Sequence, residues 1–113
     1  MSKISFQDIG NQMATFHAGE GVTAGQVVKM TGNCTVGPCS AGDRFCGVAG
    51  EPRNGVAGVQ VAGFVKVPAT LPLSVGMVGL SADGVGGIKA DTNGVTTLVV
   101  DVDSAAKTAV ICL

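Results

Sequence analysis

Alternation of apolar and polar residues is clearest in residues 54–68. Valines recur there at every second position, with polar or small residues between them: Val59, Val61, Val65 and Val67. This period of two is typical of a β-strand that buries one face. The preceding Asn54-Gly55 predicts a tight turn, because both residue types enter positive φ at low cost. Pro68 ends the pattern, since it has no backbone donor for a neighbouring strand.

Two glycines, Gly58 and Gly63, interrupt the side-chain cover of this segment. A glycine inside a strand usually marks a bulge or a sharp bend. We therefore predict one long central strand that bends at its glycines and has shorter strands on either side.

Shorter apolar runs, separated by turns rich in Gly, Asn, Asp and Pro, predict the other strands. We place them at residues 26–30, 34–36, 43–49, 77–80, 87–90, 95–102 and 108–113. Identical residues recur at one constant offset along the chain, which suggests a repeat of two related halves. Examples are Gly25 with Gly76, Val27 with Val78, and Val48 with Val99. The whole pattern predicts an all-β fold, either a small Gly-rich β-barrel or a sandwich of short strands.

The N-terminal residues differ from the rest, because their apolar side chains follow neither a helical nor a strand period. These side chains are Ile4, Phe6, Ile9, Met13 and Phe16. We divide the chain into an extended N-terminal arm at residues 1–18 and a single β-barrel domain at residues 19–113. The five apolar residues are candidate partner-binding residues, since an apolar arm is useful only where a partner receives it. A first strand packed on the domain itself is an equal alternative. Under the arm interpretation, removal of residues 1–17 leaves a folded domain.

Composition narrows the possible functions. Glycine supplies 18 of the 113 residues, Trp and Tyr are absent, and charged residues make up 13% of the chain with a net charge of −1. Binding to nucleic acid or to an anionic membrane needs clustered positive charge, so neither partner is expected. Low net charge on an apolar chain favours association with another protein. No apolar run is long enough for a transmembrane helix and no signal core is visible, so we expect synthesis in the cytoplasm without processing.

Patterns for catalysis and for metal binding are not evident in the sequence. His17 is the only histidine, and no nucleophile pattern accompanies it. The acidic residues lie singly in turns, where Asp side chains cap the backbone. Asp101 and Asp103 share one strand face and could hold a hard cation, but a solvent-facing hairpin rim is the better interpretation. The loops at Asp83 and Asp91 lack the closing Glu of a calcium loop. We expect no enzyme activity, no metal site and no cofactor.

The four cysteines have spacings that fit neither a zinc site nor a redox Cys-x-x-Cys motif: Cys34, Cys39, Cys46 and Cys112. Buried free thiols in a reducing compartment are the preferred interpretation, because free Cys is among the most buried residue types. A disulfide that joins Cys39 to Cys34 or to Cys46 is the minor alternative.

The order of several segments resembles that of a known family. The segments are Val22-Thr-Ala-Gly-Gln-Val-Val, Ala41-Gly-Asp-Arg-Phe-Cys-Gly-Val-Ala, residues 55–68 ending in Gly-Phe-Val-Lys-Val-Pro, Val75-Gly-Met-Val, the strand that follows Asn93-Gly94, and Ala109-Val-Ile-Cys-Leu. In this order, residues 19–113 resemble the capsid cement, or head decoration, proteins of tailed phages. The chain departs from that family in its four cysteines and its longer arm.

The resemblance implies a small β-barrel without catalytic residues. It also implies a structural virion protein on the outer surface of the mature bacteriophage capsid, which stabilises the capsid and binds the major capsid protein, commonly as a homotrimer. No individual site residue follows from the resemblance. The alternative is a non-enzymatic ligand-binding or adhesion β-barrel module, and the absence of Trp and Tyr argues against sugar as its ligand.

Overall fold

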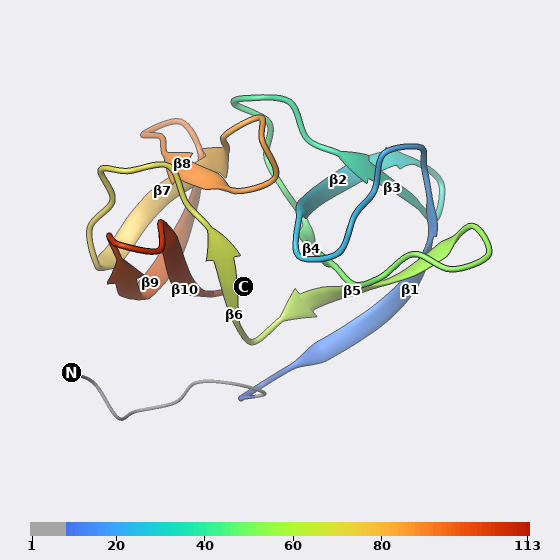
Figure 1. The fold of residues 1–113 in the computed structure, drawn as a ribbon, viewed down its shortest axis with the longest axis horizontal. Coiled ribbons are helices and arrows are strands. Elements are labelled where there is room, and N and C mark those ends of the chain that lie inside the picture. Colours follow the sequence, from blue (N-terminus) through green and yellow to red (C-terminus); the bar gives the residue numbers. More distant parts are fainter. Residues whose placement is uncertain (1–8) are drawn as a thin grey trace.

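The computed structural model of the protein describes residues 9–113, which form an all-β fold of two sheets (Figure 1). The strands in these residues are β1 (Gln12–Ala18), β2 (Val27–Gly32), β3 (Thr35–Pro38), β4 (Gly47–Ala49), β5 (Val56–Ala62), β6 (Phe64–Pro68), β7 (Gly76–Ala82), β8 (Ile88–Ala90), β9 (Val95–Asp103) and β10 (Thr108–Cys112). The sequence prediction of an all-β barrel fold is confirmed.

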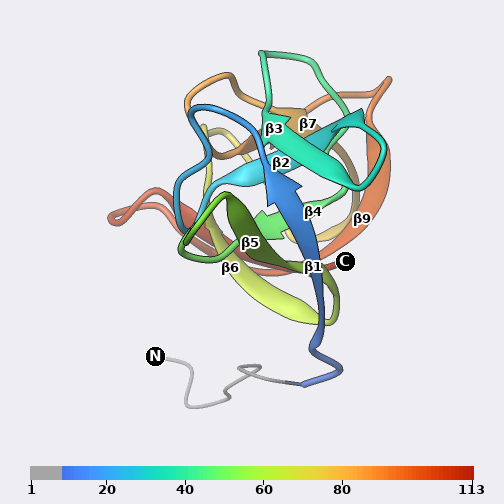
Figure 2. The same cartoon turned by 90° about the vertical axis from the view of Figure 1, so that its right-hand side faces the viewer.

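The first sheet is a closed barrel with the strand order β1-β3-β2-β4-β5. β1 closes the barrel, because it pairs antiparallel with β5 and parallel with β3. The second sheet has the order β6-β10-β9-β7-β8, and its strands pair antiparallel. Figure 1 shows this second sheet on the left and the barrel on the right, joined at the bottom where β5 leads into β6. Figure 2 brings the barrel to the front, with β1 crossing it.

The two sheets repeat one topology. Starting from β1, the barrel order can be written β1-β5-β4-β2-β3, and the second sheet then matches it strand for strand as β6-β10-β9-β7-β8. The closing contact is also repeated, since Ala18 pairs parallel with Val36 in the barrel and Ala69 forms a parallel bridge with Ile88 in the second sheet. The predicted internal repeat is therefore confirmed, as two units of the same strand order. The second unit differs in that a single bridge joins its two ends.

The segment at residues 54–68 starts as predicted but is two strands, not one. Asn54 and Gly55 have φ of 54° and 80°, and Arg53 and Val56 exchange two backbone hydrogen bonds of 2.8 and 3.0 Å across this tight turn. The strand then breaks at Gly63, which has a φ of 94° and separates β5 in the barrel from β6 in the second sheet. The bend at this glycine was predicted. The sequence analysis does not predict that the chain passes at this glycine from the barrel to the second sheet.

Two other expectations about strands need correction. Of residues 43–49, only Gly47–Ala49 is a strand, because the backbone of Asp43 bonds instead to Ser40 and to Ala82 of the second unit. Within the range assigned to the arm, Gln12–Ala18 is strand β1, which is the alternative of a first strand packed on the domain. Removal of residues 1–17 takes away most of the strand that closes the barrel, so we correct the expectation that a folded domain remains.

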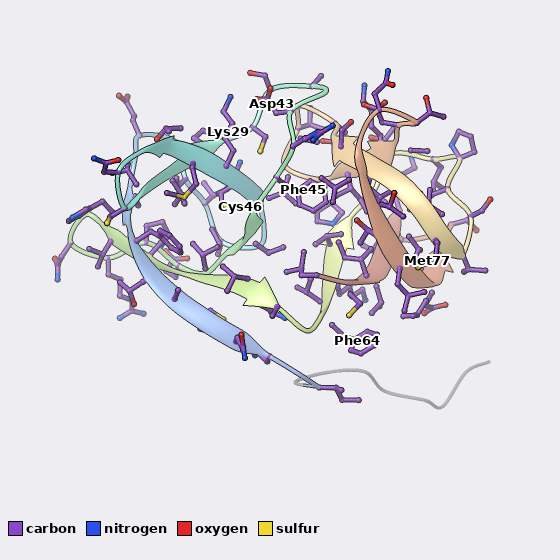
Figure 3. The ribbon with its side chains drawn as sticks, turned by 180° about the vertical axis from the view of Figure 1, so that it is seen from behind. Lys29, Asp43, Phe45, Cys46, Phe64 and Met77 are labelled. Carbon is purple, nitrogen blue, oxygen red and sulfur yellow. The ribbon has the colours of Figure 1, made fainter. Side chains whose placement is uncertain are left out.

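Buried apolar residues form two clusters. One fills the barrel: Val22, Val28, Val36, Ala49 and Val59. The other joins the units, since Val27, Phe45 and Val48 of the first unit pack with the buried residues of the second: Val67, Ala69, Leu80, Ala82, Ile88, Val99, Ala109 and Ile111. Figure 3 shows Phe45 between the two units. The units therefore share a core.

Substitution of Gly63 tests the junction between the units. A Cβ at this position would lie 2.5 Å from the carbonyl carbon of Gly10, and the φ of 94° is strained for any other residue. We expect Gly63→Ala to lower the free energy of unfolding by about 2 kcal/mol or more, measured by urea denaturation. Gly25→Ala is the control, because Gly25 also has a positive φ of 81° but nothing lies within 4 Å of its added Cβ. Equal losses in the two variants would refute the role of close packing at Gly63.

Candidate partner-binding surface

The structure separates the candidate partner-binding residues into different groups. Ile4 and Phe6 lie outside the described residues. The side chains of Ile9 and Met13 are 50% and 55% exposed. Phe16 is partly buried and packs against the cluster that fills the barrel. Alternation along β1 explains the difference between Met13 and Phe16, because successive side chains of a strand point to opposite faces.

Of the other residues considered for chemistry, His17 lies in the barrel sheet, whereas Asp101 and Asp103 lie together in the second sheet. His17 is exposed on β1, and its backbone N–H donates to the carbonyl of Cys34 at 2.7 Å. Asp101 and Asp103 are exposed on β9 and line a shallow hollow that also contains Lys66 and Thr108. The carboxylate of Asp103 accepts the backbone N–H groups of the next turn at 3.0 Å, as expected for a capping Asp. Among residues 9–113, no group of three or more His, Cys, Asp or Glu side chains could hold a metal ion.

The outward side of the second unit carries a row of apolar residues that the sequence analysis did not single out. In the strand register, Cys112 of β10 lies between Phe64 of β6 and Leu98 of β9, and Leu98 lies opposite Met77 of β7. Met77 is 67% exposed, and the other three side chains are partly buried. Figure 3 shows Phe64 below the second sheet, directed away from it.

A second row lies beside the first and brings charge to the same side of the sheet. Val110 of β10 lies between Lys66 of β6 and Asp101 of β9. Both charged residues are exposed, whereas Val110 is partly buried. We call these two rows together the β10 face: Phe64, Cys112, Leu98, Met77, Lys66, Val110 and Asp101.

The exposed residues near the N-terminus adjoin the β10 face. The backbone N–H of Phe64 donates to the carbonyl of Ile9 at 3.1 Å, so the Ile9 segment runs beside β6. Met13 lies opposite Gln60 in the register of β1 and β5, and the Gln60 amide donates to the carbonyl of Phe64 at 3.0 Å. Ile9 and Met13 therefore belong to segments that run beside or near the β6 edge of the β10 face.

A signal for this face was present in the sequence. Most strands of the chain alternate apolar with polar or small residues, but Val110, Ile111, Cys112 and Leu113 are apolar without interruption. Such a run predicts a strand that is covered on both faces. In the structure Ile111 is fully buried, whereas Val110 and Cys112 belong to the outward β10 face.

A charged pair holds the loop between β3 and β4, whose backbone also bonds to Ala82 of the second unit. The Lys29 ammonium donates to the Asp43 carboxylate at 2.5 Å, and the backbone N–H of Ser40 donates to the same carboxylate at 2.8 Å. These bonds lower the pKa of Asp43, and the bond to Asp43 raises the pKa of Lys29. Figure 3 shows the two side chains together at the top of the molecule.

The thiols beside this pair are suited to packing rather than to reaction. All four cysteines lie within the described residues and are free thiols, so neither considered disulfide is formed. The expectation of buried thiols is wrong for Cys34, which is exposed, and Cys39, Cys46 and Cys112 are partly buried. Burial, and then the Asp43 carboxylate, raises the pKa of Cys39 to about 11. Burial also raises the pKa of Cys46. The thiolate is the nucleophilic form of cysteine, so the raised pKa makes both side chains less reactive at neutral pH than an exposed thiol.

The Lys29–Asp43 pair gives stability a defined pH dependence. Because the pKa of Asp43 is lowered, its contribution is present above about pH 4 and is lost as the pH falls through the lowered value. Because the pKa of Lys29 is raised, its contribution is present below about pH 10 and is lost as the pH rises further. We expect Asp43→Asn to lower the melting temperature slightly at pH 7 and to converge with the unaltered protein in strong acid. Glu51→Gln, at an exposed position, is the control. A constant difference at all pH values would contradict the assignment.

A comparison of Phe16 with Met13 separates packing from surface exposure in β1. We expect Phe16→Ala to lower the free energy of unfolding by about 2 kcal/mol, because the ring packs against the barrel cluster. Met13→Ala should change it by less than about 0.5 kcal/mol, because its side chain is 55% exposed. Urea denaturation measures both values. A larger loss for Met13→Ala than for Phe16→Ala would contradict the inward position of Phe16.

Residues 9–113 combine exposed apolar side chains with charged ones, and the structure brings no metal-binding group together among them. Apolar side chains extend across both units, with Lys66 and Asp101 beside them. Within residues 9–113, no helix is long and apolar enough to cross a membrane. Neither the scan of protein-family models nor the search of curated proteins returned a match for this chain.

Proposed function

We propose that the protein is a structural virion protein that decorates a mature phage capsid and stabilises it by binding the major capsid protein. The observation that carries this proposal is the repeated topology of the chain. Two units with the same strand order share one core, so their relative position is fixed. A rigid body of two similar units suits a partner that itself presents similar sites at regular intervals, as a capsid shell does.

Exposed apolar side chains support the same proposal. Met13 and Met77, one in each unit, are 55% and 67% exposed. Contiguous apolar patches on a protein surface mark sites that bind other proteins, and Met77 lies opposite Leu98 of the β10 face in the strand register. Methionine is well suited to such surfaces, because its flexible side chain adapts to the shape of a partner.

Stabilisation of the capsid follows from binding alone. A protein that binds the expanded shell and not its precursor shifts the equilibrium toward the expanded shell by mass action. Weak contacts of single copies are sufficient when several linked copies bind neighbouring subunits, because linkage raises the effective concentration of each further contact. No catalytic step is needed, and we expect none. The homotrimer implied by the family resemblance is part of this proposal.

Co-sedimentation with expanded and unexpanded shells, assembled from the major capsid protein of the phage that encodes the chain, tests the proposal. We expect binding to expanded shells in a fixed ratio to the capsid subunits, and a higher melting temperature of the decorated shell. Met13→Asp should weaken binding while leaving the melting temperature of the free protein unchanged. Val85→Asp is the matched control, since Val85 is 83% exposed at a loop tip. A protein that ignores both kinds of shell would contradict the proposal and favour an adhesion or ligand-binding module.

A further inference from the structure

The chain contains two Asn-Gly dipeptides, at residues 54–55 and 93–94, and both lie in turns. An asparagine that precedes glycine deamidates readily, because its side-chain amide is attacked by the backbone nitrogen of the next residue and glycine has no side chain to hinder the attack. The two dipeptides have the same reactive groups. The structure places them in different surroundings.

The turn at Asn54 leaves the attacking nitrogen without a partner. Asn54 and Gly55 are both exposed, and nothing lies within 4 Å of a Cβ added to Gly55. Among residues 9–113, no acceptor lies within hydrogen-bond distance of the Gly55 N–H. The turn itself is closed by the two hydrogen bonds between Arg53 and Val56, at 2.8 and 3.0 Å. Local opening of this hairpin tip lets the Gly55 nitrogen approach the Asn54 side chain.

The turn at Asn93 holds the same groups in place. The N–H of Gly94 donates to the backbone carbonyl of Asp91 at 2.9 Å, so the attacking nitrogen has a partner. The N–H of Asn93 donates to the Asp91 carboxylate at 2.9 Å, and the carbonyl of Asn93 accepts from the Arg44 guanidinium at 3.2 Å. A Cβ added to Gly94 would collide with the carbonyl oxygen of Leu80. Attack at Asn93 therefore requires more of the structure to open.

We propose that Asn54 is a self-modification site, which the Gly55 backbone nitrogen converts to aspartate and isoaspartate. The nitrogen forms a bond to Asn54 Cγ, the bond from Cγ to the side-chain nitrogen breaks, and ammonia leaves with the proton of the Gly55 N–H. Water then opens the resulting succinimide ring at either of its two carbonyl carbons. One water is consumed and one ammonia is released, and nothing is oxidised or reduced.

The product changes a turn beside the strand that closes the barrel. The carbonyl of Gly55 accepts the backbone N–H of Ala18 at 2.9 Å, and Ala18 pairs with Val36 where β1 meets β3. Aspartate adds a negative charge at this turn, whereas isoaspartate also lengthens its backbone by one carbon. The proposal goes beyond capsid binding, because it concerns a reaction of the chain with itself and needs no shell.

Peptide mapping by mass spectrometry tests the proposal on the unaltered protein, aged at mildly alkaline pH in buffer and in urea. Trypsin cleaves at Lys66 and Lys89, which separates the two sites. In the folded protein we expect Asn54 to deamidate about fivefold faster or more than Asn93, since each bond of the Asn93 turn must be broken first. In urea the two rates should be similar, because glycine follows both asparagines.

Two variants separate the chemistry of each turn. In Asn54→Gln, ring closure through the longer side chain is slow, so the isoaspartate detected by enzymatic methylation of the aged protein should fall to the level left by other sites. Asp91→Ala removes the carboxylate that holds the Asn93 N–H and should speed the reaction at Asn93 but not at Asn54. Equal rates at the two sites of the folded protein would overturn the proposal. So would a faster reaction at Asn93, or an Asn54 that reacts only in urea.

Discussion

Burial of β2 on both of its faces is the constraint on which the rest of the structure depends. Val27 and Val28 are neighbours in this strand, so their side chains point to opposite sides, yet neither is exposed to solvent. Val28 belongs to the cluster inside the barrel, and Val27 belongs to the cluster between the units. Each buried valine stabilises the fold by about 1.5 kcal/mol or more. One strand thus fixes the barrel interior and the second unit together, and the two units cannot separate without exposing it.

The sequence predicts much of the strand pattern but not which sheet each strand joins. Val59 and Val67 keep the same alternation through Gly63, so residues 54–68 look like one strand. Both valines are buried, but in different clusters. Periodicity reports that one face of a strand is covered, and it carries no information about what covers it. The glycine was recognised as a bend, whereas its role as the passage between units depends on contact with the distant Gly10.

The candidate surface was predictable only in part, for a related reason. Ile9 and Met13 are exposed as a partner-binding role requires, but Phe16 packs inward. The inward positions of β1 include small residues such as Ala14, so the alternation of apolar and polar residues is weak there. For that reason the sequence does not distinguish a first strand from an extended arm. The β10 face was missed because its register joins strands from distant parts of the chain. Such a surface exists only after the sheet has formed.

The two units share a strand order but differ in how they are closed and in the side chains of their outward positions. The first unit is closed by pairing of β1 with β3, and a cluster of buried apolar side chains fills its interior. The outward positions of β1 carry polar side chains such as Thr15 and His17. In the second unit one bridge replaces the closing pair, and the outward positions hold apolar side chains such as Leu98 and Cys112 beside the charged Lys66 and Asp101. Closure removes sheet edges that could pair with other chains. One strand order therefore accommodates two ways of joining its ends and different side chains at its outward positions.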